Sequence, residues 1–437
     1  MNASPRAYRA SILHFLSDPG PSDDPLATEY FEDGLLVVSD GHVLAAGPAR
    51  ELLPTLPAGT QVSDLRPRLI LPGFVDTHIH YPQTDVIASY GAQLLDWLER
   101  YTFPAERSFS NVEHARAVCE FFLDELLRNG TTTALVFGTV HRQSVDVFFE
   151  AAEARGMRMI AGKVLMDRNC PDDLRDTPTE GVRESAELIE RWHGRARLGY
   201  AITPRFAITS SDEQLRLAGE LARAHPTVHV HTHVAENREE VEWARKLFPW
   251  SRSYLDVYER YGLMRERSVF AHCIHLDEED RRRLGKSGAA AAFCPSSNLF
   301  LGSGLFDVDA MDRSKIPIGL ATDVGGGTSF SMLRTLADAY KVAQMGGRSL
   351  APARAFYFAT LGGARALGLQ EVIGNFAPGK EADFIVLDLE ATALLQRRTR
   401  AAWTVMEKMF AVMTLGDDRC VEQVYLLGRQ PAGRVPR

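Results

Sequence analysis

The chain has 437 residues, of which 45% are hydrophobic and 24% charged, with a formal net charge of −8. This composition is that of an ordinary soluble globular protein and argues against a disordered, fibrous or disulfide-stapled chain. The acidic balance argues against a nucleic-acid partner, and no apolar run approaches the ~18 residues that a membrane span needs. The five Cys form no C-x-x-C pair, which indicates a reducing compartment, so we expect a cytoplasmic protein with no membrane partner.

Both ends of the chain carry short strand-like segments. They are 12–16, 34–38 and 42–46 near the start, and 384–387 and 420–427 near the end. Asp40-Gly41 between two of them is a strong signal for a two-residue hairpin turn. Neither end is long enough to bury a core alone. We therefore expect residues 1–70 and 373–437 to form one composite small β-domain, a β-sandwich.

Between these ends, short apolar runs alternate with helical patterns. Eight runs are strand candidates: 74–80, 131–138, 158–165, 198–205, 228–236, 268–276, 289–298 and 317–325. Eight strand-then-helix units predict an α/β protein whose residues 71–372 form a (β/α)₈ TIM barrel. A doubly wound open sheet is the alternative. It would more often have fewer strands and a Gly-rich phosphate loop, and no G-x-G-x-x-G pattern stands at a strand end here.

Helix boundaries have sequence signals of their own. Ser110-x-x-Glu113 has the spacing of a capping box, and Gly130 is placed to end the helix that it would start. Ser211-x-x-Gln214 predicts a second helix start in the same way.

The first strand of the predicted barrel ends with two histidines, His78 and His80. Because residues i and i+2 of a strand face the same side, the two imidazoles point together into the barrel. They lie at its C-terminal end, where barrel enzymes place their sites. Two imidazoles on one face are what a zinc or iron site takes from a single strand. A packing role is the alternative for this pair taken alone.

The fifth strand carries His229, His231 and His233 on one face. Only His233 is near enough to the C-terminal end to reach a metal, and the two deeper histidines suit a hydrogen-bonded polar layer. Glu236 follows where the strand gives way to a loop, so it can stand beside a metal-bound water without binding the metal. A charge in the first turn of a helix is the alternative for Glu236.

The sixth and eighth strands complete the set. His272 points inward at the top of the barrel, whereas His275 has the opposite parity and suits a structural role. Asp323 ends the eighth strand, where a carboxylate can complete a metal site and orient a water. Metal-competent groups thus stand at the same rim on four strands. We expect His78, His80, His233 and Asp323 to bind the metal.

These residues, with the Ile70-Leu71-Pro72-Gly73-Phe74 approach to the first strand, resemble the pattern of the amidohydrolase superfamily. The segment that leads from the barrel back into the small β-domain, Pro378-Gly379-Lys380-Glu381-Ala382-Asp383, also resembles the corresponding segment of that superfamily. Binuclear members use a Lys or Glu from the fourth strand to bridge two metals, and 198–205 offers neither. The resemblance therefore implies one Zn²⁺ per subunit, with Fe²⁺ as an alternative.

Several loops resemble, more narrowly, those of the guanine deaminases within that superfamily. They are the segments 80–83, 94–106, 203–206, 231–237, 297–301 and 322–327. The resemblance implies hydrolysis of guanine to xanthine and ammonia, and a homodimer. One departure is Tyr81 before Pro82, where we expect a trimmed pocket wall.

The resemblance also implies roles in catalysis. Zinc lowers the pKa of water toward ~7, and Asp323 accepts the proton of that water or holds the hydroxide. Glu236 protonates the ring nitrogen next to C2 and then relays protons to the leaving amine. His272 donates a hydrogen bond to the oxygen that develops negative charge.

Recognition needs groups that read an oxopurine. Gln83 offers donors and an acceptor, and Arg205 offers a donor fork for the carbonyl oxygen, with a surface ion pair as the alternative for Arg205. Phe206 and Trp97 can stack on the flat ring, with core packing as their alternative. The residues expected to contact the substrate are His80, Gln83, Trp97, Arg205, Phe206, His233, Glu236 and His272.

Two other functions stay open at this point. One is another deaminase of the same superfamily, acting on a cytosine, an s-triazine or an adenosine-like ring. The other is a non-enzymatic scaffold on the same barrel, although such proteins typically lose metal ligands.

Overall fold

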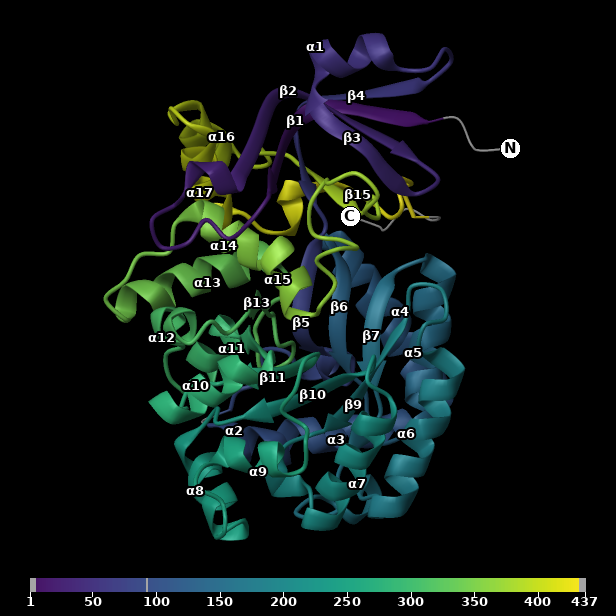
Figure 1. The fold of residues 1–437 in the computed structure, drawn as a ribbon, viewed down its shortest axis with the longest axis vertical. Coiled ribbons are helices and arrows are strands. Elements are labelled where there is room, and N and C mark those ends of the chain that lie inside the picture. Colours follow the sequence, from purple (N-terminus) through teal and green to yellow (C-terminus); the bar gives the residue numbers. More distant parts are fainter. Residues whose placement is uncertain (1–4, 92, 432–437) are drawn as a thin grey trace.

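The protein is described here by a computed structural model that covers residues 5–91 and 93–431. It has two sheets: a barrel of parallel strands enclosed by helices, and a second sheet that lies at one end of the barrel (Figure 1). Strands from the start and the end of the chain lie side by side in the second sheet.

The eight strands of the barrel are all parallel to their neighbours. They are β5 (Phe74–His80), β6 (Thr131–Phe137), β7 (Arg158–Gly162), β9 (Gly199–Pro204), β10 (His229–Val234), β11 (Ser268–His272), β12 (Ala290–Phe293) and β13 (Ile318–Leu320), and the two-residue β8 (Val164–Leu165) pairs with β9 beside this path. Backbone hydrogen bonds join the first strand of the barrel, β5, to the segment that follows the last strand, β13. The Asp323 N–H donates to the His78 carbonyl at 3.0 Å, and the His80 N–H donates to the Val324 carbonyl at 2.8 Å. The predicted TIM barrel is confirmed.

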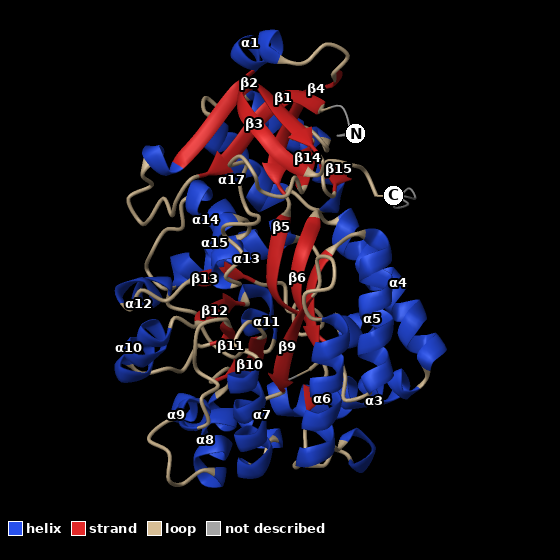
Figure 2. Ribbon diagram, turned by 45° about the vertical axis from the view of Figure 1, so that its right-hand side comes forward, coloured by secondary structure: helices blue, strands red, loops and turns tan. Residues whose placement is uncertain are grey.

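Helices surround the barrel, as the alternating apolar and amphipathic patterns predict (Figure 2). They are α4 (Val112–Arg128), α5 (Arg142–Arg155), α6 (Pro178–Trp192), α7 (Asp212–Ala224), α8 (Arg238–Leu247), α9 (Tyr254–Arg260), α10 (Glu278–Ser287), α11 (Pro295–Phe300), α12 (Val308–Arg313), α13 (Met332–Met345), α14 (Pro352–Phe358) and α15 (Leu361–Ala366). Ser211 caps α7 as predicted, because its hydroxyl accepts from the Gln214 N–H at 3.1 Å. The prediction for Ser110 is wrong, since Asn111 caps α4 instead. Gly130 follows α4 with φ +80°, which a glycine adopts without steric cost.

Most of the predicted strands extend too far at their C-terminal ends. The seventh was expected over 289–298, but Pro295 begins α11, and the eighth, expected over 317–325, ends at Leu320. The reason is physical: loops that cover a buried pocket are as apolar and as buried as the strands that lead into them. Apolar runs therefore do not mark the point where regular pairing stops.

The second sheet has the strand order β15-β14-β4-β1-β2-β3. Its members are β1 (Arg6–Phe15), β2 (Thr28–Ser39), β3 (His42–Pro48), β4 (Gln61–Pro72), β14 (Phe384–Leu387) and β15 (Val421–Tyr425). The predicted hairpin is present, with φ of +48° at Asp40 and +81° at Gly41, as a tight turn requires. β4 was not predicted, because its first half is polar and partly exposed.

The C-terminal segment also carries helices. α16 (Ala393–Arg400) and α17 (Val405–Leu415) lie between β14 and β15 in the sequence, and α17 packs against α13 and α14 of the barrel (Figure 1). The segment 373–437 thus contributes to both parts of the molecule, and the boundary at residue 373 stays a prediction.

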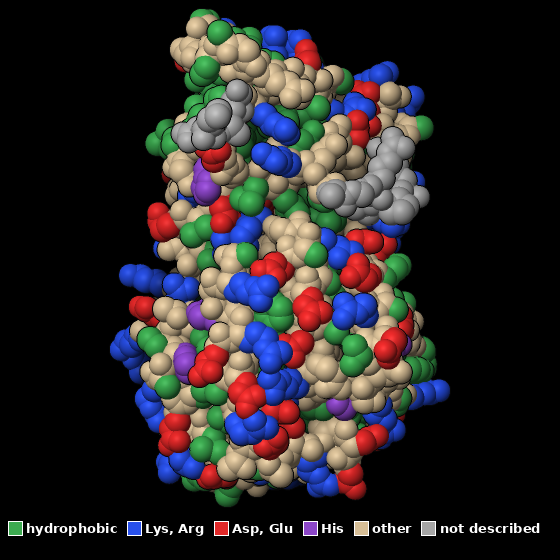
Figure 3. All heavy atoms as spheres, turned by 90° about the vertical axis from the view of Figure 1, so that its right-hand side faces the viewer, with side chains coloured by type: hydrophobic (Ala, Val, Ile, Leu, Met, Phe, Trp, Pro, Cys, Tyr) green, Lys and Arg blue, Asp and Glu red, His purple; other side chains and the backbone are tan. Residues whose placement is uncertain are grey.

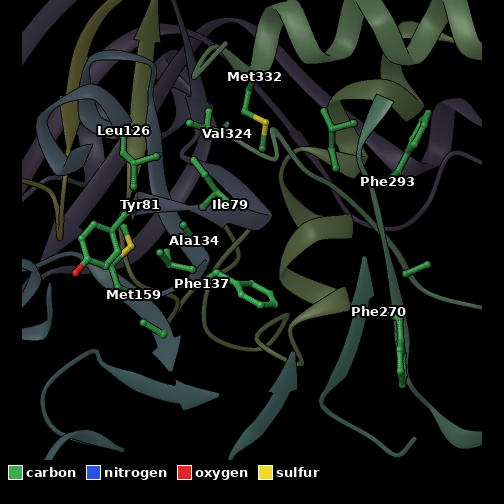
Figure 4. Close-up of a cluster of buried hydrophobic side chains, with 14 of the residues drawn as sticks. Ile79, Tyr81, Leu126, Ala134, Phe137, Met159, Phe270, Phe293, Val324 and Met332 are labelled. Carbon is green, nitrogen blue, oxygen red and sulfur yellow. The ribbon is translucent and has the colours of Figure 1, made fainter. Parts of the chain in front are cut away.

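A large hydrophobic core fills the space between the barrel strands and their helices. Ile79, Leu126 and Met332, from β5, α4 and α13, belong to this core (Figure 4). Tyr81 lies in it too, and its hydroxyl donates to the Ser144 carbonyl at 2.7 Å. The expectation that Tyr81 trims the pocket wall is therefore wrong, because its ring packs between Phe109 and Phe148.

A buried charge network ties the second sheet to the barrel. The Arg197 guanidinium donates to Glu381 at 2.7 Å, to the Gly156 carbonyl at 2.7 Å, and to Asp383. Arg158 also donates to Glu381, at 2.8 Å. Because Glu381 and Asp383 lead directly into β14, these bonds fix the C-terminal strand against the barrel.

The surface gives no sign of a charged docking face in the view of Figure 3. Basic and acidic side chains are interspersed over that face, without a contiguous basic area. Within the described residues, no helix is long and apolar enough to cross a membrane.

Candidate active site

A pocket opens at the C-terminal ends of the barrel strands. Every residue that was predicted to contact the substrate lines it: His80, Gln83, Trp97, Arg205, Phe206, His233, Glu236 and His272. The wall also includes residues that sequence reasoning did not single out, namely Leu94, Leu98, Ser297, Leu301 and Gly326.

Three imidazoles and one carboxylate converge at the floor of this pocket. The Nε2 atom of His80 lies 3.2 Å from Nε2 of His78 and 3.2 Å from Nε2 of His233. The Asp323 Oδ1 atom lies 3.2 Å from His78 Nε2 and 3.5 Å from His80 Nε2. The structure thus brings together all four residues that were predicted as metal ligands.

Hydrogen bonds behind the cluster orient the rings. His233 Nδ1 donates to the Arg205 carbonyl at 2.7 Å, so the proton is on Nδ1 and the lone pair is on Nε2. His78 Nδ1 lies 2.7 Å from Nε2 of His231, the deeper histidine of β10. Such partners fix the tautomer and the orientation of a ligating histidine.

Burial sets the charge of these rings. Burial lowers the pKa of His78, and it lowers the pKa values of His80 and His233 well below their ordinary value, so all three imidazoles are neutral. For Asp323, burial alone would raise the pKa, but the adjacent His78 lowers it and the group is a carboxylate. Neutral imidazoles and an ionised carboxylate are the forms that bind a metal.

This donor set fits a divalent metal ion. The lone pairs of neutral imidazoles repel one another at 3.2 Å unless a proton or a cation lies between them, and the Arg205 carbonyl holds the proton of His233 on the far side of the ring. Nitrogen and carboxylate ligands of this kind suit zinc. The groups that could hold a metal are therefore present.

The backbone at the strand ends is strained. His272 has φ +72°, Asp323 has φ +51° and Ala235, next to Glu236, has φ +51°. Residues other than glycine rarely adopt this left-handed region, which costs of order 1–3 kcal/mol each and is concentrated at functional sites. The strain turns the side chains of His272 and Asp323 toward the pocket floor, and no sequence signal announces it.

Glu236 and His272 form a second pair beside the cluster. Glu236 Oε2 lies 3.3 Å from His272 Nε2, and Glu236 Oε1 accepts from the Ser303 hydroxyl at 3.1 Å. Burial raises the pKa of Glu236 to about 7, although His272 opposes the shift. For His272 burial would lower the pKa, but Glu236 and Asp323 raise it overall. One carboxyl near neutrality beside a basic imidazole is an arrangement suited to proton transfer.

The opposite wall of the pocket carries polar groups that can read a flat ring. Arg205 pairs with Glu106, and the Nη1 atom lies 2.9 and 2.8 Å from the two carboxylate oxygens. Gln83 donates to Glu106 at 3.4 Å and accepts from the Gly325 N–H at 3.2 Å. Phe206 and Trp97 are both buried in the pocket wall, where the sequence placed them.

Three supporting residues were missed as contributors to the site. Asp76 accepts from the His78 N–H and the Thr322 N–H, both at 3.2 Å, and so links β5 to the segment after β13. Asn298 accepts from His272 Nδ1 at 2.9 Å. In the sequence, Glu106 was only the last residue of the segment 94–106, whose resemblance to a loop of the guanine deaminases gave it no role of its own. Two histidines are structural as predicted: His229 of β10 bonds to the Leu367 carbonyl, and His275, three residues after β11, bonds to the Ser303 carbonyl.

Comparison with known proteins agrees with this geometry. Residues 69–430 match the amidohydrolase family. The chain is 52% identical to guanine deaminase of Escherichia coli (strain K12) over 97% of each chain. It superimposes on a solved structure of E. coli guanine deaminase with a TM-score of 0.96, at 50% identity, over 98% of this chain and all of that one.

A second solved structure holds a ligand. It is guanine deaminase from C. acetobutylicum with bound guanine in the active site, which matches with a TM-score of 0.88 at 28% identity, over 98% of this chain and all of that one. The chain therefore belongs to the amidohydrolase family. Two relatives that match over 97% of the chain, at 52% and 41% identity, are a guanine deaminase and a probable guanine deaminase, and the resemblance inferred from the loops is confirmed.

The bond between His231 and His78 generates a prediction about metal affinity. Replacing His231 with Leu removes the partner of His78 Nδ1, and we expect zinc to bind about 10- to 100-fold more weakly. The measurement is a competition titration with a chromophoric chelator.

His229→Leu is the matched control, because His229 lies two residues earlier on the same strand, is equally buried and contacts no member of the cluster. It should leave zinc affinity within a few-fold of the parent. Equal losses in the two variants would mean that His231 contributes packing alone.

Proposed function

We propose that this protein is a guanine deaminase, which hydrolyses guanine to xanthine and ammonia. The observation that carries the proposal is the meeting, in one pocket, of a metal-competent cluster and a polar wall suited to an oxopurine. The similarity to guanine deaminases along nearly the whole chain supports it.

We propose one Zn²⁺ per subunit, held by His78, His80, His233 and Asp323, with Fe²⁺ as an alternative. A bound divalent metal would lower the pKa of water and so provide a nucleophile at neutral pH. The remaining chemistry belongs to the side chains around it.

Two carboxyl groups, those of Asp323 and Glu236, transfer the protons in this proposal. Asp323 accepts a proton from the attacking water, and Glu236 donates one to the ring nitrogen beside C2 of guanine. The water oxygen forms a bond to C2, and the bond from C2 to the amino nitrogen breaks. The C2 hydroxyl then gives its remaining proton to the ionised Glu236, which passes it to the amino nitrogen, and this nitrogen leaves as ammonia. The proton held by Asp323 returns to Glu236 and restores both groups. A pKa near 7 lets Glu236 both donate and accept at neutral pH.

His272 stabilises the transition state in this scheme. Its Nδ1–H donates to Asn298, and its Nε2 faces the carboxyl groups of Glu236 and, at 3.8 Å, Asp323. A ring whose pKa is raised can carry a proton on Nε2 and donate it to the oxygen that develops negative charge at C2.

Substrate recognition falls to the opposite wall. Arg205 and Gln83 offer donors to the carbonyl side of the base, while Phe206 and Trp97 cover its faces. Leu94, Leu98 and Leu301 complete an apolar surround for the ring.

A substrate panel tests the proposal. The metal-loaded chain should convert guanine to xanthine, followed by ultraviolet absorbance, and release ammonia from cytosine, adenosine and an amino-s-triazine at least ~100-fold more slowly. A chelator should abolish turnover and added zinc should restore it. Ammonia release from one of the other rings, with none from guanine, would contradict the proposal.

Glu236→Gln tests the proposed proton transfer. The amide keeps the shape of the side chain but cannot carry the proton, so kcat on guanine should fall by about 10²–10⁴-fold. Zinc content should stay unchanged, because Glu236 is not a proposed ligand. A variant that retains its zinc and most of its turnover would exclude Glu236 as the acid and base.

The resemblance also implies a homodimer and a cytoplasmic location. All five Cys are free and four are buried, which supports a reducing compartment. Large exposed apolar side chains on the C-terminal helical segment, Leu394 and Trp403, are available for a subunit contact.

A further inference from the structure

Glu106 is a buried carboxylate that the proposed chemistry does not use, and it lies behind the pocket wall in contact with Arg205 and Gln83. It lies on α3 (Phe103–Arg107), in the segment that follows β5 and folds over the pocket. Glu106 is fully buried and its partner Arg205 is 2% exposed. Burying an unpaired carboxylate costs several kcal/mol, so its partners indicate why it is there.

The carboxylate accepts hydrogen bonds from both of the groups proposed to read the substrate. Arg205 Nη1 lies 2.9 Å from Oε1 and 2.8 Å from Oε2. Gln83 Nε2 lies 3.4 Å from the same Oε1 atom. The Phe103 ring, from the same short helix, lies 5.4 Å from the guanidinium carbon of Arg205. α3 thus holds the Arg205 side chain from two sides.

Glu106 also determines which way the Gln83 amide points. The Gln83 Oε1 atom accepts from the Gly325 N–H at 3.2 Å, while the Gln83 amide nitrogen faces Glu106. A flipped amide would place an oxygen against the carboxylate and a nitrogen against a backbone N–H, and both contacts would be repulsive. The nitrogen of Gln83 is therefore held on the side of Arg205.

We infer that Glu106 is a positioning residue that sets the specificity of the pocket for a purine with an oxygen at C6. This inference rests on the proposed function. By accepting from Arg205 and from Gln83, Glu106 fixes the directions of their remaining N–H groups, which are donors on one side of the pocket. A 6-oxo group and the neighbouring N7 are acceptors and suit such a wall, whereas a 6-amino group would set donor against donor.

A merely structural ion pair would also keep Glu106 and Arg205 buried together. The structural role and the positioning role predict different losses of activity when Glu106 is replaced. A structural lesion weakens binding and turnover of every purine equally, but loss of positioning weakens only those ligands that carry the 6-oxygen.

The test compares guanine with 2-aminopurine, which has the same 2-amino leaving group but only hydrogen at C6. In Glu106→Gln, kcat/KM for guanine should fall by about 10- to 100-fold, mainly through KM. For 2-aminopurine it should change by less than about threefold. Equal falls for the two substrates, or no fall for guanine, would overturn the inference.

Binding measurements separate this inference from the proposed function. Calorimetry gives the ratio of affinities for hypoxanthine, which has the 6-oxygen, and unsubstituted purine, which lacks it, without any turnover. The parent should prefer hypoxanthine, and Glu106→Gln should remove most of that preference. A parent that binds with this preference but fails to deaminate guanine would contradict the proposed function alone. A preference unchanged in the variant would overturn the role of Glu106.

Two further variants keep the test decisive. Glu106→Asp retains the charge opposite Arg205, and so protects the fold, but withdraws the carboxylate from Gln83; it should lose part of the preference for hypoxanthine. Glu381→Gln is the control, because it makes the same change in a part-buried carboxylate that accepts from two arginines at the other end of the barrel. It should leave the ratio of guanine to 2-aminopurine turnover unchanged.

Discussion

The convergence of three neutral imidazoles and one carboxylate at the barrel rim is the constraint on which the rest of the site depends. His80 places its Nε2 atom 3.2 Å from Nε2 of His78 and 3.2 Å from Nε2 of His233. Such an arrangement is unfavourable unless a proton or a cation lies between the lone pairs. The Arg205 carbonyl orients the His233 ring, and His231 orients the His78 ring, each through a hydrogen bond to Nδ1. Residues at the barrel strands therefore fix the geometry of the cluster.

The same contacts connect the metal-competent floor with the wall that reads the substrate. Arg205 orients His233 through its carbonyl and faces the pocket through its guanidinium, which Glu106 holds. Asp76 joins the first barrel strand to the segment after the last one, and Asp323 emerges from that junction. The groups proposed for recognition and for catalysis are therefore joined by one network of hydrogen bonds at the barrel rim.

Much of this could be predicted from the sequence, because the relevant rules are local. Alternation along a strand places His78 and His80 on one face, and the order of the strands brings Asp323 to the same rim. Other features could not be predicted. Glu106 lies 99 residues from Arg205, and nothing in either segment announces the pair. The left-handed backbone at His272 and the early ends of the strands follow from tertiary packing over the pocket.

The most direct test of the account is the metal content of the folded chain. Purified protein is stripped with a chelator, dialysed against zinc and measured by inductively coupled plasma mass spectrometry, beside a variant in which His78 and His80 are both replaced by Ala. The account predicts about one zinc per chain in the parent and none retained by the variant. Two metals per chain, or one that the double variant keeps, would contradict it.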